Sequence, residues 1–452
     1  MNGQHRPTRR TALALAGAAA AGLVYAPEAA ARPRGREGRR LRVYLGAYTG
    51  GAPGHGIGVA SADPDTGALR LESVVPAEDP SFLALSATGR VLYAVNEVAE
   101  GRVSAYALAP DGTVRGLLGQ SPSGGAHPCH LALHPGGRHL FTADYTSGTV
   151  GVVELRPGGV PGELVQVVRY TGSGPDPERQ DGPHAHMVLP DPAGERLLTA
   201  DLGTDTVRVH RFDARRGLLT DGAEVRMAPG SGPRHLAFHP CGRTVYVLGE
   251  LDSTLTSCAY DPARGTLTPV ATVPILPRGA DPAGTTAAEV LVSADGRFVY
   301  ASNRGHDLVT VLAAGASGGI RPRPVSHHPC GGRSPRHIAL GAAAPGASGA
   351  LGAAQRLLYT ANQDSGTVAL LRRDPVSGVL ALSRGAARLR PGGVRATRAT
   401  GPVRGPRPEP RRLRAGGPDR QAYLSPGRSG RPGPRPGAGW PRRRRAPWRA
   451  VR

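Results

Sequence analysis

Arginine, histidine and glutamate residues stand at matching places of a repeated pattern in this sequence. Each lies beside the start or the end of a short apolar run. Arginine binds carboxylate or phosphate through a planar fork, histidine exchanges protons near neutral pH, and a positioned glutamate can act as a base. These residue types suit ester hydrolysis or the binding of an anionic ligand. They are His130, His186, His235, His337, Arg234, Arg304, Arg336, Glu97, Glu250 and Glu289.

The pattern that positions them recurs six times. Each copy is an apolar run, a turn with a marker glycine, and a second apolar run. The first copy spans Pro80–Asn96 and the last spans Pro335–Asn362. Neighbouring copies are roughly 50 residues apart, which is the period of a propeller blade. The half-copy Val43–Thr49 supplies a seventh unit.

A second, weaker repeat follows the first in several copies. It reads Asp-x-x-x-Gly-x-Leu and begins at Asp63, Asp213, Asp261 and Asp374. Because aspartate starts a turn and glycine supplies the positive φ that the turn needs, this repeat indicates the outer hairpin of the same unit. Four strands in each of seven units predict an all-β fold, the seven-bladed β-propeller. A β-sandwich with fortuitous internal similarity is the alternative.

The propeller interpretation predicts where a ligand site lies. The innermost strand of each blade lines a central channel, and the next strand runs back antiparallel. The start of the first strand and the end of the second therefore meet at one rim. Rim positions differ between copies while strand interiors repeat, which indicates residues chosen for a ligand. Alternatively, these polar groups only satisfy one another around a wet channel.

The net charge of +22 is unevenly distributed. Residues 384–452 hold +18 and residues 1–31 hold +2, which leaves +2 for residues 32–383. The repeat domain is therefore nearly neutral, and it shows no basic face interleaved with aromatic residues. Nucleic-acid binding is a poor interpretation of such a domain.

The N-terminal residues 1–31 have the features of a secretory signal. Arg9 and Arg10 precede an apolar run that ends at Val24, and small residues follow at Ala29–Ala31. This predicts a twin-arginine signal peptide and a secreted or cell-envelope protein, or a cytoplasmic one if the signal is not functional. A linker would cover 32–40 and the propeller 41–383. No later segment has the ~20 apolar residues needed to span a bilayer.

From Arg384 onward the composition changes to arginine, proline, glycine and alanine without a β period. Residues 384–452 are expected to be a disordered tail or the product of a frameshift, outside the fold. The four cysteines, Cys129, Cys241, Cys258 and Cys330, have no metal-ligand spacing, and no HExxH motif is present. We expect incidental thiols, no metal and no cofactor.

Several stretches resemble the lactonase family of seven-bladed propellers, which includes bacterial 6-phosphogluconolactonases and is related to carboxymuconate-lactonizing enzymes. The resemblance runs from about Val43 to Leu382. It is carried by Gly182-Pro-His-Ala-His186, Gly203-Thr-Asp-Thr-Val207, Gly232-Pro-Arg-His-Leu-Ala-Phe-His239, Glu250-Leu-Asp-Ser-Thr254, the run Gly296–His306 and Ala361-Asn-Gln-Asp-Ser365.

The resemblance implies catalytic roles for His186, Arg234, Glu250 and Arg304, which we expect to converge on one face of the channel. Substrate contacts are expected from His130, His184, His235, Glu289 and Arg336. The chain departs from the family in three places: Gly249 replaces an asparagine, Gly341–Ala354 is an insertion, and the last apolar strand, which completes the first blade, is missing after Leu380.

The implied function is hydrolysis of a sugar-derived lactone at the rim. Arg234 or Arg304 would stabilise the oxyanion, and His186 or Glu250 would activate water. The alternatives are a muconate-type cycloisomerase and a non-catalytic binding platform. An exported enzyme would meet a non-phosphorylated lactone. The expected partner is this small molecule alone, with no nucleic acid and no membrane span, and the protein is expected to be a monomer.

Overall fold

The computed structural model describes residues 23–26, 41–50, 55–63, 65–315, 318–341, 355–383 and 387–388. All of them belong to the compact unit Met1–Ala396. Every regular element among these residues is a strand. The described chain accordingly contains no helix long and apolar enough to cross a membrane.

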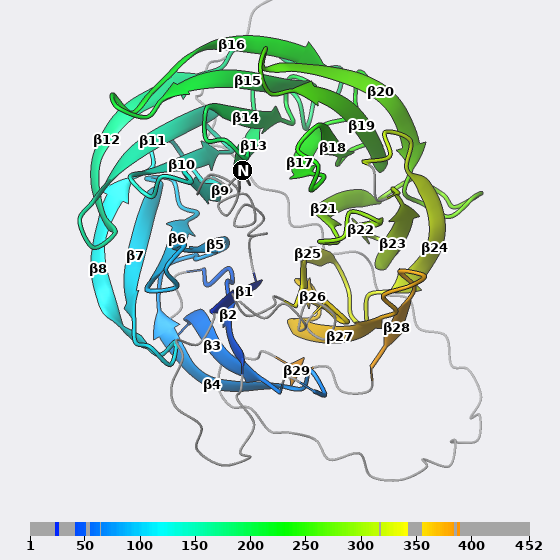
Figure 1. The fold of residues 1–452 in the computed structure, drawn as a ribbon, viewed down its shortest axis with the longest axis horizontal. Coiled ribbons are helices and arrows are strands. Elements are labelled where there is room, and N and C mark those ends of the chain that lie inside the picture. The colour runs from blue at the N-terminus through cyan, green and yellow to red at the C-terminus, as the bar shows by residue number, and fades with distance from the viewer. Residues whose placement is uncertain are drawn as a thin grey trace, which may run out of the picture. The chain divides into compact units, whose positions relative to one another are not determined.

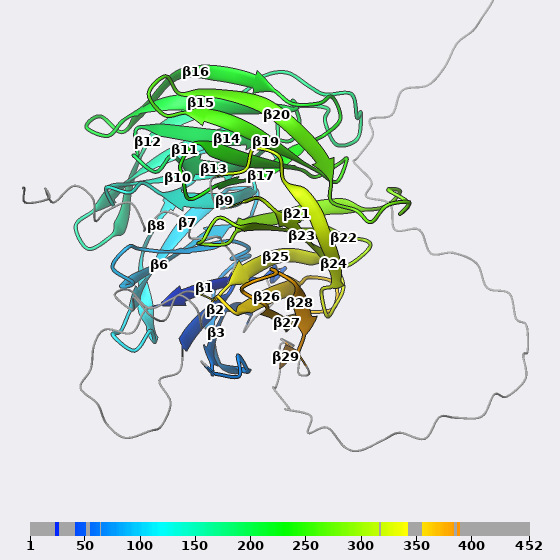
Figure 2. The same ribbon diagram turned by 45° about the vertical axis from the view of Figure 1, so that its right-hand side comes forward.

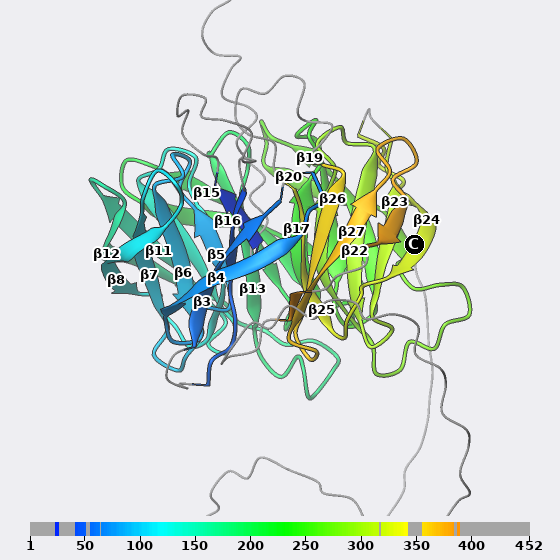
Figure 3. The ribbon, with the colours of Figure 1, turned by 90° about the horizontal axis from the view of Figure 1, so that it is seen from below.

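The strands form seven antiparallel sheets arranged in a ring (Figure 1). In each sheet the strands follow one another from the centre outward, and the innermost strands of neighbouring sheets pack against one another around the ring. A view turned by 45° shows the sheets as separate blades (Figure 2), and a view from the side shows the strands running between the two faces of the ring (Figure 3). The predicted seven-bladed propeller is therefore confirmed.

The first three blades account for the strands up to residue 169. Blade 1 is β1 (Leu23–Ala26), β2 (Leu41–Leu45), β3 (Gly56–Ala62) and β4 (Leu69–Pro76). Blade 2 is β5 (Leu83–Leu85), β6 (Val91–Asn96), β7 (Arg102–Leu108) and β8 (Val114–Pro122). Blade 3 is β9 (Pro128–Leu133), β10 (His139–Asp144), β11 (Thr149–Arg156) and β12 (Val160–Arg169).

The remaining four blades follow in chain order. Blade 4 is β13 (Ala185–Pro190), β14 (Arg196–Asp201), β15 (Thr206–Asp213) and β16 (Leu218–Arg226). Blade 5 is β17 (Pro233–Phe238), β18 (Thr244–Gly249), β19 (Thr254–Asp261) and β20 (Thr266–Pro274). Blade 6 is β21 (Thr286–Val292), β22 (Phe298–Arg304), β23 (Leu308–Ala313) and β24 (Arg323–Pro329). Blade 7 is β25 (Pro335–Leu340), β26 (Leu357–Asn362), β27 (Thr367–Arg373) and β28 (Leu380–Leu382), with β29 (Ala387–Arg388) also paired to β27.

The two sequence repeats build the two hairpins of a blade. The marker glycines lie between the first and second strands, where Gly137 and Gly242 have φ values of 69° and 70°; glycine adopts such values without strain. In the outer repeat, Asp213 Oδ1 accepts hydrogen bonds from the backbone N–H groups of Arg215 (2.9 Å) and Arg216 (3.2 Å). The turn chemistry predicted from both repeats is thus present.

Buried tyrosines on the second strands of blades 1, 2, 5, 6 and 7 fasten these blades to the next. The Tyr93 hydroxyl donates to the carbonyl oxygen of Gly159 in blade 3 at 2.8 Å. The Tyr359 hydroxyl donates to that of Gly67 at 2.9 Å, which joins blade 7 to blade 1. The same seam is closed by an apolar cluster that contains Val43, Leu45, Ala60, Ala339, Leu357 and Leu370.

The innermost position of blade 1 is a correction to the sequence analysis. The sequence analysis leaves this position without a strand, because the C-terminal strand that fills it in the family is missing. In the structure β1 occupies it: β1 pairs antiparallel with β2, with Leu23 opposite Leu45, and packs beside β5 and β25. This strand lies within the predicted signal peptide. It can take this place because the edge of β2 presents unpaired backbone N–H and C=O groups, with which any extended segment can pair. The rest of residues 1–40 lies outside the described residues.

We predict that deletion of residues 1–31 lowers the melting temperature by about 4 °C. The deletion removes β1 and leaves about three backbone hydrogen bonds of β2 unmade, at about 1 kcal/mol each. Differential scanning calorimetry measures the change, and a variant lacking only residues 1–20, which keeps β1, is the control. Equal melting temperatures for the two truncations and the full chain would show that β1 does not stabilise the ring.

The end of the fold also needs a correction. The propeller was expected to end at residue 383, but Ala387 and Arg388 pair with Val368 and Thr367 of β27. They extend the outer edge of blade 7, because β27 still offers backbone partners beyond the short strand β28. The remainder of the segment 384–452 and most of the Gly341–Ala354 insertion lie outside the described residues, so the frameshift interpretation stays a prediction.

Candidate active site

The side chains at the rim are aimed by an irregularity at the start of several innermost strands. The pairing of β17 with β18 passes over Arg234, so this residue has no partner in the register. The pairing of β13 with β14 passes over His186, and that of β25 with β26 passes over Arg336. Such bulges re-aim a side chain. Two consecutive residues of a regular strand point to opposite faces of the sheet. At a bulge, the bulged residue and its neighbour can both point into the channel.

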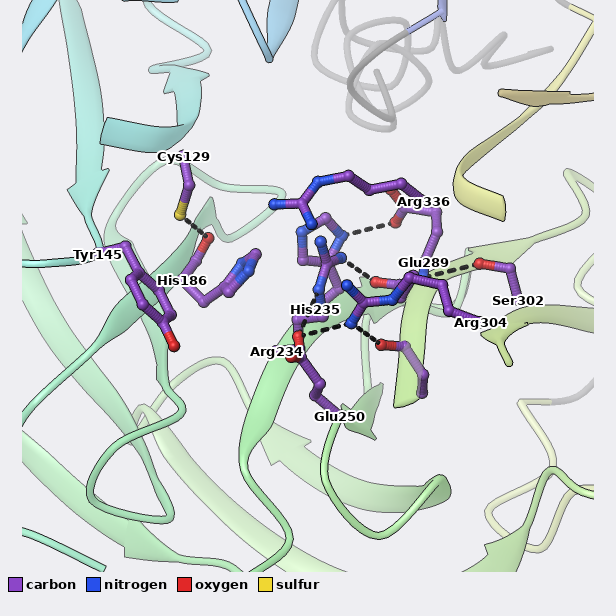
Figure 4. A network of polar contacts seen from close by, with 12 residues as sticks. Cys129, Tyr145, His186, Arg234, His235, Glu250, Glu289, Ser302, Arg304 and Arg336 are labelled. Atoms are coloured by element: carbon purple, nitrogen blue, oxygen red, sulfur yellow. Dashed lines mark hydrogen bonds and ion pairs between the residues drawn. The ribbon is translucent and has the colours of Figure 1, made fainter. Parts of the chain in front are cut away.

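Three guanidinium groups meet on one buried carboxylate, Glu250, which directly follows β18. Figure 4 shows two of them, those of Arg234 and Arg304, beside Glu250. Its Oε2 lies 2.8 Å from Nε of Arg234 and 3.1 Å from Nη2 of Arg304. Its Oε1 lies 2.7 Å from Nη2 of Arg179. Arg234 also donates from Nη1 to the Ala288 carbonyl oxygen.

This arrangement holds Glu250 in its ionised form. Burial alone would raise the pKa of the carboxyl, but Arg304, Arg234 and Arg179 together lower the pKa to about 2. Both carboxylate oxygens of Glu250 are already paired with guanidinium groups. Glu250 is therefore suited to ordering the arginines rather than to removing a proton from water.

His186 also has a lowered pKa, but for an imidazole this favours the uncharged form. Burial, followed by the nearby positive charge of Arg234 and the His235 ring, holds the pKa of His186 well below the usual histidine range. The imidazole is consequently neutral at pH 7 and can accept a proton. Its ring lies in edge contact with Tyr145, with centroids 5.6 Å apart, and among the described residues its Nδ1 has no hydrogen-bond partner.

These groups surround a pocket of about 250 Å³. His186, Glu250 and Arg304 line it, while Arg234 contacts Glu250 and lines a neighbouring cavity. The four residues expected to converge are therefore brought together by the structure. The remaining lining residues are Glu97, Cys129, Tyr145, Arg179, Thr286 and Arg336.

A second buried cluster lies next to the pocket, further toward blades 1 and 7. Glu289 lies 2.8 Å from Nδ1 of His235 and 2.5 Å from Nδ1 of His337. The His235 ring in turn contacts the rings of His186 and His130, with centroids 5.3 and 5.5 Å apart. Burial lowers the pKa of His235 to about 4 even though Glu289 opposes the shift. Burial opposes ionisation of Glu289, but its contacts with His235 and His337 keep the pKa of the carboxyl well below its usual range.

The cluster predicts that stability falls in mild acid. A histidine whose pKa is lowered on folding binds a proton in the unfolded state at a pH where the folded state does not, so stability decreases as pH falls. His235 alone, with a pKa near 4 against 6.5 unfolded, should cost about 2 kcal/mol between pH 7 and pH 5; His130 and His186 shift in the same direction. Urea unfolding at both pH values measures this, and equal unfolding free energies would contradict it.

The five residues expected to contact substrate are placed differently from one another. Arg336 lines the pocket together with His186. His235 and Glu289 line a neighbouring cavity of about 360 Å³ that shares Arg336 with it, while His130 is buried beside Phe82. His184 lies outside both linings: it stacks on Tyr145 with centroids 4.5 Å apart, and its Nε2 lies 3.3 Å from Asp181.

Sequence reasoning missed Arg179. It lies in the loop between β12 and β13, which has no counterpart in the repeat, so rim equivalence could not select it. The available signal was its position three residues before the Gly182-Pro-His-Ala-His186 motif. Tyr145 stands at a rim position that the repeat did identify, but it was not assigned to the site. All four cysteines are free, and the described residues contain no group of three His, Cys, Asp or Glu side chains placed to hold a metal ion.

Comparison with known proteins agrees with this architecture. A family model described as "Lactonase, 7-bladed beta-propeller" matches residues 42–392. The 6-phosphogluconolactonase of Bacillus subtilis (strain 168) is 29% identical over 75% of this chain and 93% of its own length. A 6-phosphogluconolactonase of Formosa agariphila is 29% identical over 75% of this chain and 94% of its own length.

A solved structure gives the same result. The periplasmic gluconolactonase of Pseudomonas aeruginosa superposes with a TM-score of 0.70 at 30% identity, covering 77% of this chain and 96% of that one. Since the family model covers most of the chain and the blades it describes are all present, this chain belongs to the lactonase family of seven-bladed β-propellers.

Proposed function

We propose that this protein hydrolyses a sugar-derived lactone in the pocket bounded by His186, Glu250 and Arg304. The observation that carries the proposal is a neutral histidine beside several guanidinium groups ordered by one carboxylate. Relatives named 6-phosphogluconolactonase and gluconolactonase support the same reaction.

Arg304 is the group suited to stabilise the oxyanion. Attack by water places negative charge on the lactone carbonyl oxygen, and a guanidinium fixed in advance stabilises that charge without reorganisation. Arg304 lines the pocket, where Glu250 and the carbonyl oxygen of Ala287 hold its Nη2 at 3.1 and 2.9 Å. Arg234 is more deeply buried, so we assign it to the positioning of Glu250.

His186 is the group suited to move the proton. As water attacks, its proton passes to the neutral imidazole, and a tetrahedral oxyanion forms. The ring C–O bond then breaks, and the imidazolium returns the proton to the departing alkoxide oxygen. The sum is one lactone and one water converted to one hydroxy acid, with the enzyme unchanged.

The test is hydrolysis of glucono-δ-lactone and 6-phosphogluconolactone by the purified full-length chain. A pH indicator follows acid release, and heat-inactivated protein gives the spontaneous rate. We expect turnover above that rate for at least one lactone. Formation of a lactone from a muconate, without lactone hydrolysis, would establish the cycloisomerase alternative, and ligand binding without turnover would establish the binding platform.

We also propose that the protein is exported by the twin-arginine route, on the basis of Arg9, Arg10 and Ala29–Ala31. Cleavage after Ala31 would remove β1 from the mature protein, so the same residues cannot serve both as a removed signal and as a permanent strand. Mass spectrometry of the protein from its native host tests this. A mature N-terminus near residue 32 is expected, and an intact Met1 in the secreted fraction would contradict export by this route.

A further inference from the structure

The pocket contains more positive than negative charge. Arg179, Arg304 and Arg336 line it, and Arg234 contacts Glu250. Two carboxyl groups line it as well: Glu250, which three of the four guanidiniums share, and Glu97, whose pKa is raised by burial. Two carboxyl groups cannot neutralise four guanidiniums, so the pocket favours a ligand that brings negative charge.

The arginines differ in how many of their guanidinium donors already contact other groups of the protein. Arg234 is buried, forms an ion pair with Glu250 and donates from Nη1 to the carbonyl oxygen of Ala288. Arg336 donates to the Tyr48 hydroxyl at 2.8 Å and lies over its ring. Arg179 has a side chain that is 38% exposed, and its polar contacts within the described residues, to Glu250 and to Tyr145 at 3.4 Å, both use Nη2. Its Nη1 therefore remains for a ligand at the open side of the pocket.

The backbone that carries Arg179 is held in place. Asp176 Oδ1 accepts hydrogen bonds from the backbone N–H of Glu178 and of Arg179 at 2.9 and 3.1 Å. The next residue, Gln180, is fully buried and donates from Nε2 to Leu202 O and to Asp205 Oδ1, each at 2.8 Å. The guanidinium thus projects from a fixed loop, and little conformational entropy is lost when it binds a ligand.

We infer that Arg179 is a specificity-determining residue that selects lactones bearing an anionic substituent remote from the scissile carbonyl. The shared chemistry is a carboxylate or a phosphate, which the guanidinium fork binds through Nη1 while Nη2 stays on Glu250. This inference rests on the proposed function. A carboxylate-bearing sugar lactone would also reconcile the positive pocket with an exported enzyme.

The experiment compares three lactones: neutral glucono-δ-lactone, glucarolactone with a carboxylate, and 6-phosphogluconolactone with a phosphate. The variants are Arg179→Gln and Arg179→Lys, with Arg264→Gln as the matched control. Arg264 is exposed on the outer hairpin of blade 5, where it pairs with Asp261. Melting temperatures establish that the variants are folded.

We expect wild-type kcat/KM to be highest for one of the two anionic lactones, which identifies the substituent. Arg179→Gln should lower that value about 10- to 100-fold, mainly through KM, because one charge-assisted contact is lost. Because Arg179→Gln also removes one of the three partners of Glu250, the neutral lactone should lose activity too, but less than the anionic one. Arg179→Lys should keep part of the preference for the anionic lactone, and Arg264→Gln all of it.

Two results would overturn the inference while leaving lactone hydrolysis intact. One is an unchanged ratio of anionic to neutral kcat/KM in Arg179→Gln, which would make Arg179 a structural partner of Glu250. The other is a wild-type preference for the neutral lactone. If the wild type hydrolyses none of the three lactones, the proposed function itself fails, and the inference falls with it.

Discussion

Replacing His186 by asparagine should lower kcat for lactone hydrolysis by about 100- to 10,000-fold, the range for loss of a general base. Asparagine keeps a similar volume but cannot take the proton of the attacking water. The pocket lining and the neutral state of the imidazole single out this residue. Initial rates of acid release at saturating lactone measure the change.

The chain offers a matched control two residues earlier. His184 belongs to the same motif but stacks on Tyr145 outside the pocket lining, so His184→Asn should lose far less activity. The pH profile gives an independent check. Because the pKa of His186 lies well below its usual value, the rate should stay constant as pH falls from 7 through 6.5 and decline only in stronger acid. Equal losses in both variants would remove His186 from the role of base.

Replacing Arg304 by alanine should lower kcat about 100- to 1,000-fold, with a smaller effect on KM. This is the scale for removal of one oxyanion donor, which acts more strongly on the transition state than on the bound substrate. Steady-state kinetics on the best lactone separate the two parameters. Arg304→Lys retains the charge without the fork and should recover part of the rate.

Arg234→Ala offers a comparison within the same cluster. Its kcat should also fall, by roughly 100-fold. Unlike Arg304→Ala, it should also lower the stability of the fold, because Glu250 is buried and would lose one of its three partners. A raised KM with unchanged kcat in Arg304→Ala would make Arg304 a binding residue, and the oxyanion role would then pass to Arg234.

Much of this site follows from the repeat. Because each copy marks the same two rim positions, the sequence alone places His186, Arg234, Glu250 and Arg304 at one end of the channel. Local turn chemistry likewise determines the hairpins, since aspartate and glycine impose their turns within a few residues. Seven similar units bury their faces only against one another, so the ring is implied by the period.

Other properties depend on contacts between blades, which no local pattern records. The bulges that re-aim His186, Arg234 and Arg336 appear only in the strand register. The low pKa of Glu250 needs three guanidiniums from different parts of the chain, one of them Arg179 in a loop outside the repeat.

The closing strand illustrates the same limit. From sequence, residues 23–26 are part of a predicted signal peptide, and the C-terminal strand that would pair with β2 is missing. An unpaired strand edge accepts any extended backbone that can reach it, so its occupant is decided by the tertiary structure, which places β1 there. Sequence thus determined the blades and their rim, whereas the assembled ring decided which side chains share a pocket, which charges they hold and which segment completes the first blade.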